Sequence, residues 1–189
     1  MGKLVLVTGD LAAGKSTFAD ILSKRYDTCV FYKDSIKEVL GDTIGFADRK
    51  ENLKLSGATV ELMLHIFSEF AGLNKDLILE ANFHKAELER LYEIASQYNY
   101  EVLVLVLRGD INILHKRYLD RIHSGNRHPV HLSTTLDIFD DFKKYIESAR
   151  KEEIEGNVIQ INADDFSYQE DGKLLSEIDA FMKQKDDAV

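Results

Sequence analysis

The strongest chemical signal in the sequence is a short glycine-rich run near its start. Residues 9–16 contain two glycines separated by four residues and followed by Lys and Ser, which is the pattern of a phosphate-binding loop. Such a loop turns backbone N–H groups and a helix N-terminus toward an anion. We therefore expect a nucleotide triphosphate to bind at Gly9, Ala12, Ala13, Gly14, Lys15, Ser16 and Thr17.

Each residue type in this loop has a separate chemical role. The Lys15 ammonium is expected to reach the β- and γ-phosphates, and the Ser16 hydroxyl is expected to ligate Mg²⁺. Thr17 is expected to contact the α-phosphate. Ala12 stands where many such loops have a third glycine, so a positive φ there would strain the backbone. The alternative, an ordinary turn with Ser16 as helix cap, needs neither the lysine nor both glycines.

A first carboxylate, Asp34, follows the second predicted strand. An acceptor substrate can meet the γ-phosphate there, so we expect Asp34 to take the hydroxyl proton of the acceptor as a general base. A structural interpretation competes with this one, because Ser35 and Glu38 have the spacing of a capping box and Asp34 can support that helix start. Lys37, one turn further along, is expected either to hold an anionic substrate or to be a solvated surface residue.

The end of the third predicted strand offers a metal ligand. A carboxylate in this place orients a magnesium-bound water or the attacking group, so Glu80 joins Ser16 as an expected Mg²⁺ residue. The alternative is a carboxylate that faces solvent. Asn82 is expected to hold the substrate or the loop, or to cap the helix that begins near Lys85.

The most basic part of the chain lies between residues 107 and 131. Arg117 and Arg121 are four residues apart, which places both on one face of a helix, and Arg127 follows in a loop-like run. Arginines that fold over a γ-phosphate stabilise the charge of phosphoryl transfer and exclude water. We therefore expect a lid over residues 117–131, with Arg117 and Arg121 on the nucleotide and Arg127 on the acceptor. The alternative is a solvated charged surface.

The elements that must position these residues alternate between strand and helix, which is typical of a three-layer α/β/α sandwich. Strands are expected near residues 3–8, 28–33, 76–81, 101–107 and 157–162. Helices are expected near residues 15–25, 35–40, 52–72, 84–98, 110–123, 136–150 and 173–184. Residues 102–107 are apolar without alternation, as expected where helices cover both faces of a parallel sheet. In such sheets ligands bind beyond the carboxyl ends of the strands.

Composition narrows the class of protein. The chain has 189 residues, of which 44% are hydrophobic, and this predicts one globular domain over residues 1–189. The net charge of −9 disfavours a broad surface for long nucleic acid. The single cysteine, Cys29, is expected in the core, and without a signal peptide or long apolar run we expect a cytoplasmic protein with no membrane contact. Three histidines, His123, His128 and His131, have no cysteine or carboxylate cluster beside them, which disfavours zinc.

Together these motifs resemble a known family. The loop of residues 9–17, Asp34 in Lys-Asp-Ser-Ile-Lys, Glu80-Ala81-Asn82, and the arginine segment are similar to the small ATP-dependent kinases of the phosphate-loop superfamily, with an AAA-type kinase domain. The most similar group contains polynucleotide kinase, chloramphenicol phosphotransferase and zeta toxin. The resemblance implies a five-stranded parallel sheet of order 2-3-1-4-5, Asp34 as the base, and phosphate contacts from Arg117 and Arg121. The sequence departs from that group after the third strand, where the group has Asp-x-Thr-Asn.

The leading hypothesis is a kinase that uses ATP and Mg²⁺ to phosphorylate a hydroxyl of a small molecule or nucleotide. ATP is favoured over GTP because the sequence lacks an Asn-Lys-x-Asp motif and a D-x-x-G run after the third strand. The alternatives are a regulatory ATPase or switch that acts on a protein partner, a toxin-like sugar-nucleotide kinase, and a polynucleotide 5′-kinase.

Overall fold

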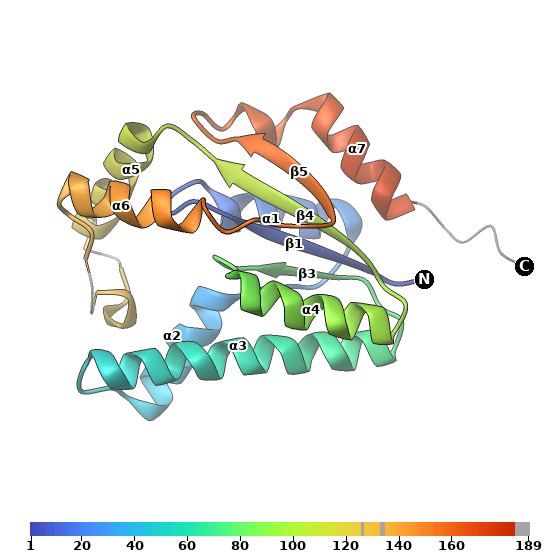
Figure 1. The fold of residues 1–189 in the computed structure, drawn as a ribbon, viewed down its shortest axis with the longest axis horizontal. Coiled ribbons are helices and arrows are strands. Elements are labelled where there is room, and N and C mark those ends of the chain that lie inside the picture. The colour runs from blue at the N-terminus through green and yellow to red at the C-terminus, as the bar shows by residue number, and fades with distance from the viewer. Residues whose placement is uncertain (126, 133–134, 184–189) are drawn as a thin grey trace, which may run out of the picture.

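A parallel sheet forms the centre of the protein (Figure 1). The computed structural model describes residues 1–125, 127–132 and 135–183, and within them five parallel strands pair in the order β2-β3-β1-β4-β5. The strands are β1 (Lys3–Gly9), β2 (Val30–Tyr32), β3 (Leu77–Glu80), β4 (Glu101–Arg108) and β5 (Asn157–Asn162). The observed order confirms the sheet that the resemblance implied. It places β1 in the middle, so the loop after β1 lies at the centre of the carboxyl edge.

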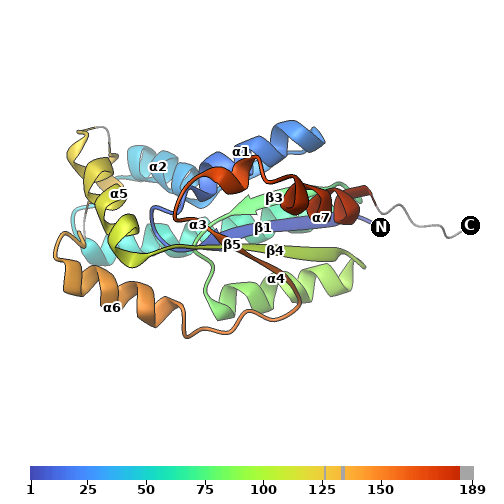
Figure 2. The ribbon, with the colours of Figure 1, turned by 90° about the horizontal axis from the view of Figure 1, so that it is seen from above.

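Helices cover both faces of this sheet. Their bounds are α1 (Lys15–Tyr26), α2 (Lys33–Ile44), α3 (Arg49–Gly72), α4 (Lys85–Gln97), α5 (Ile111–His123), α6 (Phe139–Ala149) and α7 (Gly172–Lys183), with short 3-10 turns η1 (Pro129–His131) and η2 (Ser167–Gln169). In Figure 1, α3 and α4 lie below the sheet and α7 lies above it. Figures 1 and 2 both show α5 and α6 at the end of the sheet away from the two termini.

The sheet is buried on both sides, which explains why its strands are apolar without alternation. Along β1, Val5 and Val7 pack in one cluster with side chains of α1 and α7, whereas Leu4 and Leu6 pack in a second cluster with α3 and α4. All four side chains are buried. Alternate residues of one strand therefore hold the two helix layers to the same sheet.

Several expected boundaries are corrected by the structure. The second strand is shorter than expected and begins at Val30, so Cys29 precedes it and is exposed rather than in the core. Helix α2 begins at Lys33 with Tyr32 as N-cap and no side-chain cap. The capping box expected from Ser35 is therefore wrong, because that residue already lies inside the first turn.

None of the helices among the described residues combines the length and the apolar character that a bilayer crossing requires. The expected end of the last helix, residue 184, lies outside the described residues.

Candidate active site

The phosphate-binding loop has positive φ values at two glycines and at one alanine. Gly9 and Gly14 have φ values of 121° and 85°, and a Cβ on Gly9 would lie 2.1 Å from the carbonyl oxygen of Leu107. Ala12 also has a positive φ, 60°, so the strain expected at this residue is present. Helix α1 begins immediately after Gly14 and has no side-chain cap, which leaves its first N–H groups free to face an anion.

The Lys15 side chain folds back over the loop. Its Nζ donates to the carbonyl oxygen of Asp10 at 2.7 Å and lies 3.4 Å from that of Gly9. Burial lowers the pKa of Lys15, while the nearby carboxylates of Glu80 and Asp34 raise it. The ammonium is thus already positioned among negative groups at the centre of the site.

Long-range contacts hold this loop from outside. The buried Asp10 carboxylate accepts hydrogen bonds from the Gly109 N–H at 3.2 Å and from Arg150 Nη2 at 2.5 Å. On the other side, the Tyr168 hydroxyl donates to the carbonyl oxygen of Ala13 at 3.0 Å. Arg150 and Tyr168 were not predicted from the sequence, because both are more than a hundred residues away and neither has a local motif.

Ser16 and Glu80 meet as expected. The Ser16 hydroxyl donates to Oε2 of Glu80 at 3.1 Å. They meet because β3 pairs with β1, so the end of β3 lies beside the phosphate loop. Burial raises the pKa of Glu80, and Lys15 and the Ser16 hydroxyl act in the opposite direction. A hydroxyl beside a carboxylate is an oxygen donor set that suits Mg²⁺, and Glu80 is 5% exposed rather than a solvent-facing side chain.

Asp34 lies in the first turn of α2, near the phosphate loop. Tyr32 of β2 is in register with Glu80 of β3, so α2 starts beside the pair formed by Ser16 and Glu80. The Asp34 Oδ2 accepts from Arg127 Nη2 at 3.0 Å. Burial raises the pKa of Asp34, but His131 when it is protonated, together with the charges of Arg127 and Lys15, outweighs it and holds this pKa below its usual range.

The acceptor side of the site contains Lys37 and Asn82. Lys37 Nζ donates to the neutral side-chain oxygen of Asn52 at 2.7 Å, and burial lowers its pKa while Asp34 raises it. Asn82 interacts with the Tyr145 hydroxyl of α6, and the N-cap of α4 is His84, so the capping role considered for Asn82 is wrong. A solvent-connected hollow lies between the phosphate loop and α6 and is lined in part by Asn82, Tyr145 and Arg150.

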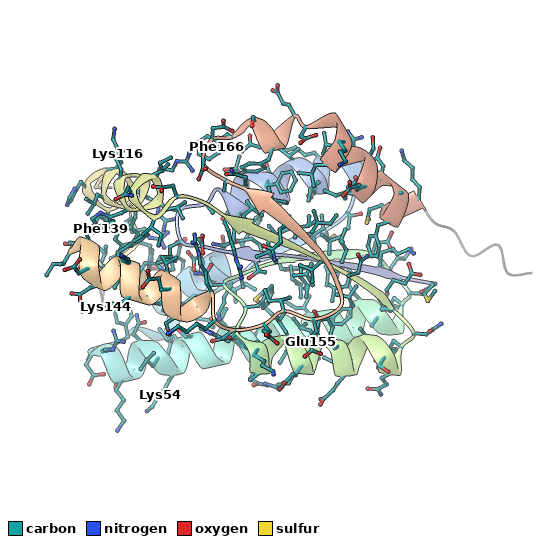
Figure 3. The ribbon with its side chains drawn as sticks, turned by 45° about the horizontal axis from the view of Figure 1, so that its top comes forward. Lys54, Lys116, Phe139, Lys144, Glu155 and Phe166 are labelled. Atoms are coloured by element: carbon teal, nitrogen blue, oxygen red, sulfur yellow. The ribbon has the colours of Figure 1, made fainter. Side chains whose placement is uncertain are left out.

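The two helix arginines do different things. Arg117 donates to the carbonyl oxygens of Ala163 and Asp164, both at 2.6 Å, and its guanidinium lies 4.3 Å from the centre of the Phe166 ring. Figure 3 shows Phe166 near the loop that follows β5. The Arg121 guanidinium has no hydrogen-bond or salt-bridge partner in the described part of the chain, and its charged neighbours include Arg127, Asp34 and Glu80. Arg121, not Arg117, is therefore the helix arginine beside Asp34 and Glu80.

Residues 4–148 match the family described as the AAA domain, and the chain belongs to this family. No curated protein sequence gives a match. Among solved structures, a candidate kinase from Chloroflexus aurantiacus J-10-fl is similar, with 23% identity, a TM-score of 0.80, and coverage of 97% of this chain and 99% of that chain.

Two further structures are similar at lower identity. A gluconokinase from Sinorhizobium meliloti 1021 has 13% identity and a TM-score of 0.56, with coverage of 96% of this chain and 97% of that one. A shikimate kinase from Bacteroides thetaiotaomicron has 14% identity and a TM-score of 0.52, with coverage of 95% and 97%. The fold is that of the small phosphate-loop kinases, as expected.

Proposed function

We propose that the protein is an ATP-dependent kinase that transfers the γ-phosphate to a hydroxyl of a small molecule or nucleotide. The observation that carries this proposal is the position of Asp34, whose carboxylate acts on the charge of Lys15 from a different element. Its side chain is 52% exposed, which leaves room for an acceptor hydroxyl at the carboxylate. A base next to the phosphate-binding lysine is what phosphoryl transfer to an alcohol requires.

The residues of the loop fit ATP and Mg²⁺. The backbone of residues 9–14 and the ammonium of Lys15 provide positive potential, and Ser16 with Glu80 provides oxygen ligands for the metal. When bound, ATP supplies the phosphoryl group and Mg²⁺ neutralises charge on its oxygens. The flat pair of Arg117 and Phe166, beside Gly14, offers a surface for the nucleotide base.

In this mechanism the protein positions charge and moves one proton. Asp34 accepts the proton of the acceptor hydroxyl as that oxygen attacks phosphorus. Arg121, whose guanidinium lacks a hydrogen-bond partner among the described residues, stabilises the negative charge that develops on the transferred group. Arg127 holds Asp34 before the substrate arrives, so the acceptor must compete with this ion pair.

The charges on the acceptor side favour a substrate that itself has a negative group. Lys37 donates to a neutral amide, whereas two cations near it, Lys33 and Arg127, are paired with Glu87 and Asp34. An anionic substituent next to the reacting hydroxyl would neutralise Lys37. Asn82 and Tyr145 border the same side and provide hydrogen-bonding groups for the rest of the acceptor.

The test is ADP formation by the purified protein with ATP and Mg²⁺ across pools of hydroxy acids, sugars, nucleosides, sugar nucleotides, antibiotics and 5′-hydroxyl oligonucleotides. Lys15→Ala serves as the blank. We expect a pool of small anionic alcohols to raise ADP formation above the blank. If ATP binds and no pool raises turnover, the kinase proposal is wrong and a switch that acts on a protein partner is favoured.

A further inference from the structure

The segment of residues 127–131, called here the lid segment, places a histidine between two carboxylates of α2. His131 Nε2 lies 2.9 Å from Glu38 Oε1, and His131 Nδ1 lies 3.9 Å from Asp34 Oδ1. Asp34 and Glu38 are four residues apart, so they are on the same face of the helix. The His131 side chain is only 7% exposed.

The two ring nitrogens are not equivalent in this arrangement. An ionised carboxylate can only accept, so the contact with Glu38 places a hydrogen on Nε2 of His131. In the neutral ring, Nδ1 then presents a lone pair toward the Asp34 carboxylate. Two acceptors that face each other can be joined by one added proton. A proton that arrives at Asp34 can therefore be shared with Nδ1 of His131.

We infer that His131 is a positioning and proton-accepting residue for Asp34, and that Asp34, His131 and Glu38 form a relay that removes the proton of the acceptor hydroxyl. This inference rests on the proposed kinase function. The positive groups around Asp34 make it a weak base. A second proton-accepting group next to Asp34, the His131 ring, would therefore complete the proton transfer.

The relay conserves atoms and charge. As the acceptor O–H bond breaks, its oxygen forms a bond to the γ-phosphorus, the bond from that phosphorus to the bridging oxygen breaks with its electron pair leaving on ADP, and the proton passes to the Asp34 carboxylate. The same proton then passes to Nδ1 of His131, after the two groups approach by about 1 Å to hydrogen-bond distance. Asp34 returns to the carboxylate form, and the imidazolium lies between two negative groups until it releases the proton to water.

The position of His131 is fixed by its neighbour in the lid segment. Val130 is fully buried, and its carbonyl oxygen accepts from Asn52 Nδ2 of α3 at 2.8 Å. Gly41 of α2 lies beneath it, where a Cβ would come within 3.2 Å of the Val130 side chain. Docking of the lid segment on α2 and α3 therefore brings His131 to Asp34.

The charges around His131 are compatible with this role. The charged groups that act on the ring are Asp34 and Glu38 of α2 and Arg127 of the lid segment, and Lys15 and Lys37 act on Asp34 in turn. Burial of the ring lowers the pKa of His131, whereas the two carboxylates raise it, and the net direction is downward. The ring is therefore neutral near pH 7 and free to take a proton.

The first test is an NMR titration of the histidine rings in the wild-type protein, Asp34→Asn and Glu38→Gln. We expect each substitution to lower the pKa of His131 by about one unit, because each removes a negative charge beside the ring. His65, an exposed histidine of α3, is the internal control and should not shift. An unchanged pKa of His131 in Asp34→Asn would overturn the inference, whatever the enzyme does.

The second test is the pH dependence of kcat with the acceptor identified by the ADP screen. Protonated His131 cannot accept a proton, so wild-type kcat should fall on the acid side at the pKa of His131, and His131→Gln should lower kcat about tenfold or more and lose that step. A uniform loss at every pH would indicate a structural role and reject the relay. His65→Gln should match wild type. If Asp34→Asn shifts the pKa of His131 but no acceptor is phosphorylated, the kinase proposal is wrong and the interaction between His131 and Asp34 is still supported.

Discussion

The phosphate loop and the acceptor side of the site are built from different kinds of contact. In the loop, buried side chains bond to backbone groups: Lys15 to the Asp10 carbonyl, Tyr168 to the Ala13 carbonyl, and Asp10 to the Gly109 N–H. On the acceptor side, charged side chains bond to one another at the surface of α2, as Arg127 does with Asp34. The first region is held by buried contacts, including the ion pair of Arg150 with the buried Asp10, and the second by an ion pair whose Asp34 carboxylate is half-exposed.

The two regions therefore suit two different tasks, which are binding of the nucleotide and selection of the acceptor. A nucleotide tail is the same for every such kinase, so a rigid backbone site serves it. In the proposed mechanism the acceptor must be selected and must displace Arg127 from Asp34. If this distinction holds, substitutions in the loop should lower activity and stability more than substitutions on the acceptor side.

Lys15→Ala should have the largest effect. Loss of a positive group aimed at the transferred phosphate should lower kcat about a thousandfold, or about 4 kcal/mol in the barrier. Far-ultraviolet circular dichroism should show an unchanged fold. Lys24→Ala, an exposed lysine of the same helix, is the matched control and should retain full turnover. Unchanged turnover in Lys15→Ala would place the reaction elsewhere.

Asp34→Asn should lower kcat about a hundredfold or more, because the amide cannot accept the hydroxyl proton. The Kd of ATP, measured by calorimetry, should stay the same, since Asp34 is on the acceptor side. Asp20→Asn, on the surface of α1, is the control. Transfer near the wild-type rate would mean that Asp34 only stabilises the start of α2.

Arg150→Met and Arg127→Met compare the two regions through the free energy of unfolding. Arg150→Met leaves the Asp10 carboxylate buried with only the Gly109 N–H, so the free energy of unfolding in urea should fall by about 2–3 kcal/mol. Arg127→Met breaks the half-exposed pair with Asp34 and should cost less than about 1 kcal/mol. Equal losses in the two variants would remove the proposed distinction between the regions.

Ala12→Gly should have the smallest effect, and of opposite sign. Glycine adopts the φ of 60° without strain, so the free energy of unfolding should rise by up to about 1 kcal/mol despite the greater entropy of the unfolded chain. Ala58→Gly, at an exposed helical position of α3, should instead lower it by about 1 kcal/mol. A lower free energy of unfolding in both variants would show that the backbone strain at Ala12 does not destabilise the protein.

The sequence predicted the loop well because all of its determinants are local. The glycines, Lys15 and Ser16 are consecutive, and the apolar strand before them fixes their place in a parallel sheet. Ser16 and Glu80 were paired correctly because the carboxyl ends of neighbouring strands meet at one edge. The strand order was implied by the resemblance to the small phosphate-loop kinases, and the observed order agrees with it.

The acceptor side was less predictable because its contacts join distant segments. The spacing of Arg117 and Arg121 correctly placed both on α5, but not the loop after β5, whose carbonyl groups bind Arg117. The position of His131 between two carboxylates depends on how the lid segment docks on α2, and no pattern within either segment specifies it. Cys29 was misplaced because an apolar stretch does not show where a short edge strand begins.

The contacts of Arg150 and Tyr168 with the phosphate loop show that the loop depends on more of the chain than the segment that matches the family. The match to the AAA domain family ends at residue 148, before either anchor. A protease that cut the connection between α6 and β5 and released the last part of the chain would leave the complete glycine-rich pattern in the remaining fragment. That fragment would lack β5 and Tyr168, one of the two anchors, so limited proteolysis would yield a product that contains the sequence pattern but not the complete site.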